Sequence, residues 1–174
     1  MKNIGAVKKQ TNNRHLNLYH IDALDRNGDS FDYYFASRNP EERLKLYTKS
    51  LDPEGIVIYA LTKEASPRLV LIQEYRYPLD AEVYALPAGL VDPGETPGQA
   101  AVREMREETG YRFTEYTEGA ACFRRPFYMG PGFTDETSCA VFGTVEISDG
   151  AAVCEATEVI RTVLADREEV RRIL

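Results

Sequence analysis

The segment from Thr96 to Gly110 carries a complete set of helix-boundary signals, and it constrains the fold more than any other part of the chain. Thr96 and Gln99 are spaced as in a capping box, and Pro97 occupies the favoured first helical position. Gly110 stands where a left-handed residue commonly ends a helix. These signals predict a helix over residues 97–109.

Strand-like stretches surround this helix. Residues 55–61 and 68–75 are rich in β-branched residues and leucine, which predicts two central strands. Residues 83–91 contain Pro87 and Gly89, which argue against a regular strand there. Further strands are expected over residues 113–123, 137–147 and 157–164, and a charged helix is expected from Asp166 to the end.

The first 50 residues have a different character from the rest. Residues 15–23 and 30–36 flank a turn-forming segment, which predicts a β-hairpin. The second strand is rich in aromatic residues, which favours sheet packing or a subunit interface. We therefore predict two parts, residues 1–50 as an N-terminal β-hairpin extension and residues 51–174 as the main domain.

Composition excludes several classes of protein. The formal net charge of −7 disfavours nucleic acid as a partner. No apolar stretch approaches the roughly 20 residues of a membrane helix, and the N-terminus lacks a signal-peptide pattern, so we expect a cytoplasmic protein with no membrane partner. Cys122, Cys139 and Cys154 lack metal-site spacing and are expected to be buried free thiols.

Three carboxylates share one face of the predicted helix. Glu104, Glu107 and Glu108 are spaced i, i+3, i+4, so their side chains converge. A solvated helix face, with Arg103 paired to Glu107, would explain such a cluster by itself. The ordered pattern around the cluster favours a functional site instead, and its positions are Gly89, Glu95, Arg103, Glu104, Met105, Glu107, Glu108, Gly110 and Tyr111.

This pattern resembles the complete Nudix box, Gly-x5-Glu-x7-Arg-Glu-U-x-Glu-Glu-x-Gly-U, where U is a bulky aliphatic or aromatic residue. The resemblance implies an α/β fold, a Nudix α/β/α sandwich with a mixed β-sheet, here with an N-terminal antiparallel β extension. It also implies a hydrolase that cleaves nucleoside diphosphates linked to another group and uses Mg²⁺ or Mn²⁺. Oxygen ligands on a rigid helix suit Mg²⁺, whereas zinc would favour His or Cys.

The resemblance also assigns roles within the box. It implies Glu104 and Glu108 as the principal metal ligands, Glu107 as a further ligand or the base for water, and the Ala88 carbonyl as an additional ligand. It implies that Arg103 orients the carboxylates and Glu95 braces the loop. Gly89 would permit close backbone approach to the substrate at the entrance of the box.

The flanking segments are similar to those of the ADP-ribose pyrophosphatase subgroup. The similarity implies that Arg76 helps to hold substrate and that Glu136, on a loop after the box, activates or positions water, so Glu107 and Glu136 both stand as candidate bases. A proline beyond the box marks the subgroup; Pro126 has the usual spacing, but Pro131 matches better locally. Ala85 stands where relatives often have Glu, and Glu82 is the candidate substitute.

The subgroup resemblance predicts hydrolysis of ADP-ribose to AMP and ribose 5-phosphate, and a homodimer formed through the N-terminal extension. Other nucleoside diphosphate sugars or dinucleoside polyphosphates are alternative substrates. A Nudix module that senses ADP-ribose without cleaving it is the alternative outside catalysis. Relatives usually have another helix after the position of Leu174, so part of the layer that covers the sheet would be missing or supplied by a partner if the chain ends there.

Overall fold

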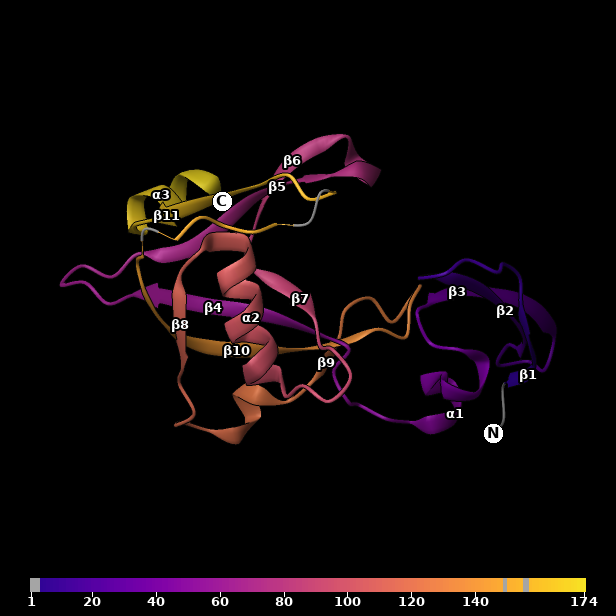
Figure 1. Cartoon of the computed structure of the whole chain (residues 1–174). Helices are drawn as coiled ribbons and strands as arrows, with labels where there is room; N and C mark the ends of the chain where they lie inside the picture. The colour runs from indigo at the N-terminus through magenta and orange to yellow at the C-terminus, as the bar shows by residue number, and fades with distance from the viewer. Residues whose placement is uncertain (1–3, 149, 155–156) are drawn as a thin grey trace. The chain divides into compact units, whose positions relative to one another are not determined.

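We analysed a computed structural model, in which residues 4–148, 150–154 and 157–174 are described. By their contacts these residues form two compact units (Figure 1). The first unit combines Met1–Asp52 with Phe127–Ser138, and the second combines Pro53–Pro126 with Cys139–Leu174. The first unit is therefore assembled from two segments that are far apart in sequence.

The first unit is built on an antiparallel sheet of β1 (Ile4–Lys9), β2 (Asn17–Leu24) and β3 (Ser30–Ser37), in that order. The predicted hairpin is β2 and β3, and β1 extends it. Tyr19, Ile21, Ala23 and Phe35 project from one face of this sheet and pack with Leu44. The short helix α1 (Lys45–Thr48) and the strand β9 (Phe127–Tyr128) complete the unit.

The second unit contains the larger sheet, whose strand order is β11-β5-β4-β10-β8, with β6 paired to β5 and β7 paired to β4. The bounds of these strands are β4 Gly55–Thr62, β5 Leu69–Arg76, β6 Ala81–Ala85, β7 Ala88–Leu90, β8 Arg112–Glu115, β10 Thr137–Glu146 and β11 Ile160–Ala165. The mixed α/β class and the N-terminal antiparallel extension are thus confirmed.

Helix α2 (Pro97–Thr109) lies across one face of this sheet (Figure 1). Ala100, Ala101 and Met105 of the helix are completely buried against Ile56, Ile58 and other residues of the sheet. A short helix, α3 (Arg167–Ile173), follows β11, and the side chain of Asp166 caps its first turn. The core therefore fixes α2 rigidly on the strands from which the site is built.

Two predictions about this unit were wrong. The strand expected over residues 113–123 ends at Glu115, and the apolar residues after it form a 3₁₀ turn over Ala121–Arg124. Cys122 lies in this turn and is exposed, whereas Cys139 is buried and Cys154 is half-buried. The apolar neighbours of Cys122 in the sequence had suggested a buried thiol, but its own side chain faces solvent.

Candidate active site

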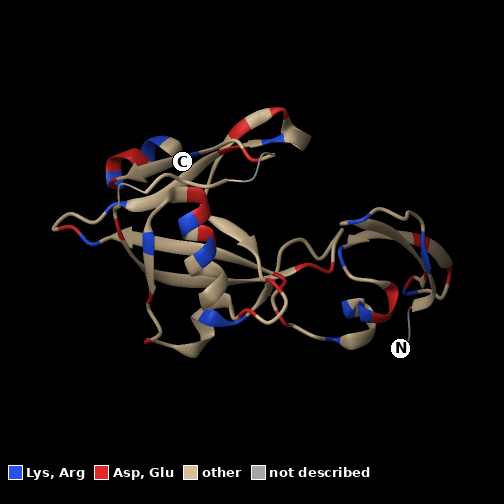
Figure 2. Ribbon diagram, viewed as in Figure 1, with Lys and Arg blue, Asp and Glu red and all other residues tan. Residues whose placement is uncertain are grey.

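The ends of helix α2 are fixed by the signals that predicted them. Thr96 and Gln99 form a reciprocal capping box, with Gln99 N–H donating to the Thr96 hydroxyl and Thr96 N–H donating to the Gln99 side chain. Gly110 ends the helix at φ 74°. Acidic and basic segments alternate along the helix (Figure 2). The carboxylates are therefore carried on a helix with both ends held in place.

Arg103 forms ion pairs with three carboxylates, two on the helix and one on the loop before it. Its guanidinium donates to both carboxylate oxygens of Glu95, at 3.0 and 2.9 Å, and to the carbonyl of Leu90 at 2.9 Å. It also donates to Glu104 at 2.7 Å and to Glu107 at 3.1 Å. These bonds raise the pKa of Arg103, the pairing with Glu95 contributing most. Arg103 thus links Glu104 and Glu107 to the loop before the helix.

Glu108 has the most unusual environment of the cluster. Only 5% of the residue is exposed, and its Oε2 has no hydrogen-bond partner in the described chain. Burial first, and then the nearby charge of Glu104, raise the pKa of Glu108 to about 8, although Ala88 N–H donates to it. Burial also raises the pKa of Glu104. A buried carboxylate beside a partly buried one calls for a cation that neutralises them.

Gly89 brings the backbone of β7 directly against this cluster. A Cβ atom at residue 89 would lie 1.9 Å from Glu104 Oε1 and 2.1 Å from its Cδ, which is much too close for any side chain. A side chain at residue 89 would therefore displace the Glu104 carboxylate, and the φ of Gly89 is not in the left-handed region. The close approach expected at Gly89 is therefore to a carboxylate of the helix.

The charges of two carboxylates outside the box also change the pKa of Glu108. Glu74 of β5 and Glu158, in the segment before β11, both raise its pKa through their charges. Sequence reasoning missed both. The alternation of a strand could have found Glu74, because it places residues 74 and 76 on the same face of β5. Arg76 Nη2 lies 2.7 Å from Glu74 Oε2, so this predicted substrate residue is linked to the cluster through Glu74.

Three other predicted site residues are outside the box, namely Glu82, Pro131 and Glu136. Glu82 is opposite Tyr75 in the β5–β6 register and accepts a hydrogen bond from Gln73 at 2.7 Å, so it lies on the other face of β5 from Glu74 and Arg76. Pro131 and Glu136 belong to the first compact unit. The described structure therefore gathers the box residues and Arg76, and it does not bring Glu82 to them.

The donor set fits a hard divalent cation. Glu104, Glu107 and Glu108 offer oxygens only, and the partnerless Oε2 of Glu108 is a buried acceptor that a cation would satisfy. The described residues of the cluster include no imidazole, and Cys154 nearby directs its Sγ at the Glu107 carbonyl, at 3.6 Å. Carboxylates of this kind on one helix suit Mg²⁺, which keeps several of its waters and shares substrate phosphates.

The second unit is a mixed α/β domain in which the helix that carries the carboxylates packs on the sheet, as the Nudix resemblance implied. Comparison with known proteins agrees with this class. The model of the NUDIX domain matches residues 51–170. The chain therefore belongs to the Nudix family.

Individual relatives agree with the assignment to this family. The chain is 36% identical over 84 residues to an ADP-ribose pyrophosphatase of Bacillus subtilis, which covers 48% of this chain and 42% of the relative. It is 30% identical over 143 residues to an ADP-ribose pyrophosphatase of Saccharomyces cerevisiae, covering 82% and 58%. The chain spans about half the length of the curated relatives it matches.

A solved structure supports the fold. The crystal structure of an ADP compounds hydrolase superposes with a TM-score of 0.67 at 18% identity, and the match covers 98% of this chain and 80% of that one. Within the described residues, none of the helices has the length and apolar character to cross a membrane.

Proposed function

We propose that the protein is a Mg²⁺-dependent pyrophosphatase that hydrolyses ADP-ribose to AMP and ribose 5-phosphate, with Mn²⁺ as a possible replacement. The observation that carries the metal dependence is the buried Glu108 carboxylate, which lies near the like charge of Glu104 and whose Oε2 has no hydrogen-bond partner among the described residues. The substrate rests on relatives that are named ADP-ribose pyrophosphatases. We further propose a cytoplasmic homodimer formed through the N-terminal extension.

In this proposal Glu104 and Glu108 hold the cation, with Glu107 and the Ala88 carbonyl as additional ligands. The bound cation would neutralise charge on the pyrophosphate and activate water as a Lewis acid. Arg103 keeps the ligands in place through its bonds to Glu95, Glu104 and Glu107. Arg76 would hold substrate, its guanidinium being half exposed while it pairs with Glu74.

Water adds across the phosphoanhydride bond, so one group must accept a proton from the attacking water. Glu107 and Glu136 are the two candidates. Glu107 is the more exposed of the box carboxylates, with 44% of its side chain exposed against 14% for Glu104. Glu136 is on a loop of the first unit. Replacing each with Gln separates the two roles.

The first test measures products with purified protein and Mg²⁺ across ADP-ribose, ADP-glucose, GDP-mannose, NADH, diadenosine polyphosphates and 8-oxo-dGTP. We expect ADP-ribose to be preferred, with AMP as a product, and we expect EDTA to abolish turnover. Glu108→Gln should lower kcat by about 100-fold or more because a ligand charge is lost. Glu118→Gln, at an exposed loop residue, is the matched control and should leave turnover unchanged.

The alternatives give different results in the same assay. Preference for another nucleoside diphosphate derivative would keep the metal chemistry and reject the assignment of ADP-ribose. Tight binding of ADP-ribose without cleavage would identify a sensing module. Near-normal turnover of Glu108→Gln at saturating Mg²⁺ would contradict its assignment as a metal ligand.

A further inference from the structure

The loop that carries Glu136 is attached to the N-terminal sheet. Ala36 N–H of β3 donates to the carbonyl of Phe133 at 2.7 Å, and Ala36 forms a parallel bridge with Thr134. The Tyr33 hydroxyl, also on β3, donates to the carbonyl of Gly132 at 2.6 Å. Consecutive residues of the loop, 132 to 134, are therefore fixed by one strand.

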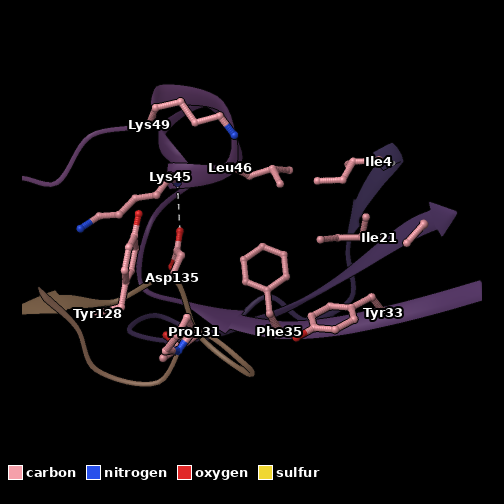
Figure 3. Close-up of a pocket in the computed structure, with 12 residues that line it drawn as sticks. Ile4, Ile21, Tyr33, Phe35, Lys45, Leu46, Lys49, Tyr128, Pro131 and Asp135 are labelled. Carbon is pink, nitrogen blue, oxygen red and sulfur yellow. Dashed lines mark hydrogen bonds between the residues drawn. The ribbon is translucent and has the colours of Figure 1, made fainter. Parts of the chain in front are cut away.

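A second group of contacts holds the other end of the loop. Lys45 N–H, at the start of α1, donates to Asp135 Oδ2 at 3.1 Å (Figure 3). The Lys45 ammonium donates to the carbonyl of Asp52 at 3.0 Å and to the Thr137 hydroxyl. The residues on both sides of Glu136 are thus bonded to the N-terminal segment, at Asp135 and at Thr137.

Glu136 itself is held mainly through its backbone. Its N–H donates to the Thr134 hydroxyl at 3.2 Å, while its side chain forms an ion pair with Arg38 Nε at 3.8 Å. The carboxylate keeps 28% of its side-chain surface exposed, so it is accessible from solvent. The position of the carboxylate consequently follows the position of the loop backbone.

Polar contacts, and not dense packing, keep this loop in place. A cavity of about 430 Å³ lies between the inner face of the N-terminal sheet, α1 and the loop. Figure 3 shows Pro131 and Asp135 on the loop side of this cavity, opposite Phe35 and Tyr33 of β3. Because the loop does not close onto a packed core there, loss of a single hydrogen bond is expected to loosen it.

We propose that Tyr33 is a positioning residue for Glu136: its hydroxyl, through Gly132, holds the loop in the arrangement in which Glu136 serves the hydrolysis. The N-terminal extension would then contribute to turnover within its own chain, separately from any role in a dimer. This inference rests on the proposed function, because it takes Glu136 as a residue that acts on the attacking water.

Tyr33→Phe tests the proposal because it keeps the ring that packs on the sheet and removes only the hydroxyl. We expect kcat for ADP-ribose to fall about fivefold, as for the loss of one hydrogen bond, with KM changed less than about twofold. Tyr47→Phe is the matched control, since Tyr47 is an exposed residue of α1 in the same unit, and it should match the parent enzyme. A Tyr33→Phe enzyme with unchanged kcat would overturn the proposal.

Glu136→Gln shows whether Tyr33 acts through Glu136. If it does, adding Tyr33→Phe to Glu136→Gln should cause no further loss of kcat, because the positioned carboxylate is already gone. A full additional fivefold loss in the double variant would mean that Tyr33 acts by another route and would overturn the proposal.

Hydrogen–deuterium exchange separates the anchoring from the chemistry. In Tyr33→Phe we expect peptides covering residues 130–136 to exchange at least about threefold faster, while α2 peptides are unchanged. Unchanged exchange in this loop would overturn the anchoring, whatever the activity. If the parent protein does not hydrolyse ADP-ribose, the proposed function fails, yet faster exchange would still support the anchoring by Tyr33.

Discussion

At the scale of single residues, Glu108 combines two opposing requirements. The chain buries the Glu108 carboxylate next to Glu104, which destabilises the fold when both are charged, and no other described residue forms a hydrogen bond with Glu108 Oε2. A group of this kind is expected where function, and not stability, has selected the residue. Arg103 offsets part of the repulsion through its ion pair with Glu104.

The raised pKa of Glu108 gives a stability prediction. The folded state binds the proton more tightly than the unfolded state, with a pKa of about 8 against a reference value of 4.5. Stability in EDTA should therefore fall as pH rises from about 4.5 to about 8, and the destabilisation should be complete above that range. Glu108→Gln removes this pH dependence.

Thermal unfolding in EDTA checks the prediction. At about pH 9 we expect Glu108→Gln to have the higher Tm, by about 2–4 °C for each kcal/mol of relief, and at about pH 4 we expect little difference. Saturating Mg²⁺ should raise the Tm of the parent protein more than that of the variant. Glu118→Gln serves again as the control. Equal Tm values of parent and Glu108→Gln at high pH would contradict this reading of Glu108.

At the scale of elements, the signals that are local in sequence gave the accurate predictions. The bounds of α2 followed from its capping box and its terminal glycine, which need no tertiary contact. The sequence prediction made strand β8 too long, because Gly119, at φ 89°, turns the chain before the apolar residues that follow. Strand β1 was missed because it is an edge strand whose residues are nearly all exposed, so it shows no alternating pattern.

The capping box yields a prediction for the helix as a unit. Thr96→Ala removes the hydroxyl that accepts from Gln99 N–H, and such losses cost about 0.5–2 kcal/mol. Tm should fall by about 2–4 °C for each kcal/mol. Thr117→Ala, in an exposed loop, is the control in thermal unfolding. If Thr96→Ala were as stable as the parent, the cap would not be what holds the start of α2.

At the scale of the whole molecule, only those site residues that lie close together along the chain could be predicted from the sequence. The box carboxylates and Arg103 lie on one helix, so their spacing revealed them. Glu74 and Glu158 come from β5 and from the segment before β11, and only the fold brings their charges near Glu108. The attachment of the Glu136 loop to β3 joins residues as much as 99 positions apart, which no local pattern indicates.

The composition of the first unit predicts how fragments behave. Residues 1–52 alone lack Phe127–Ser138, which line the cavity and bond to Ala36 and Lys45. We expect this fragment to be largely unfolded by circular dichroism and amide-proton dispersion, and we expect a fusion of residues 1–52 to 127–138 through a flexible linker to be more ordered. Equal order in both fragments would show that the distant segment is dispensable.

The split composition of this unit also matters while the protein is being made. The ribosome releases the N-terminal sheet first, and the segment that closes it follows only after the 53–126 stretch has been synthesised. At about 5–20 residues per second that delay lasts roughly 4–15 s. During this interval the segment 127–138 does not yet cover the apolar face formed by Tyr19, Ile21 and Phe35. Chaperones or another nascent chain can bind this face until the segment has been synthesised.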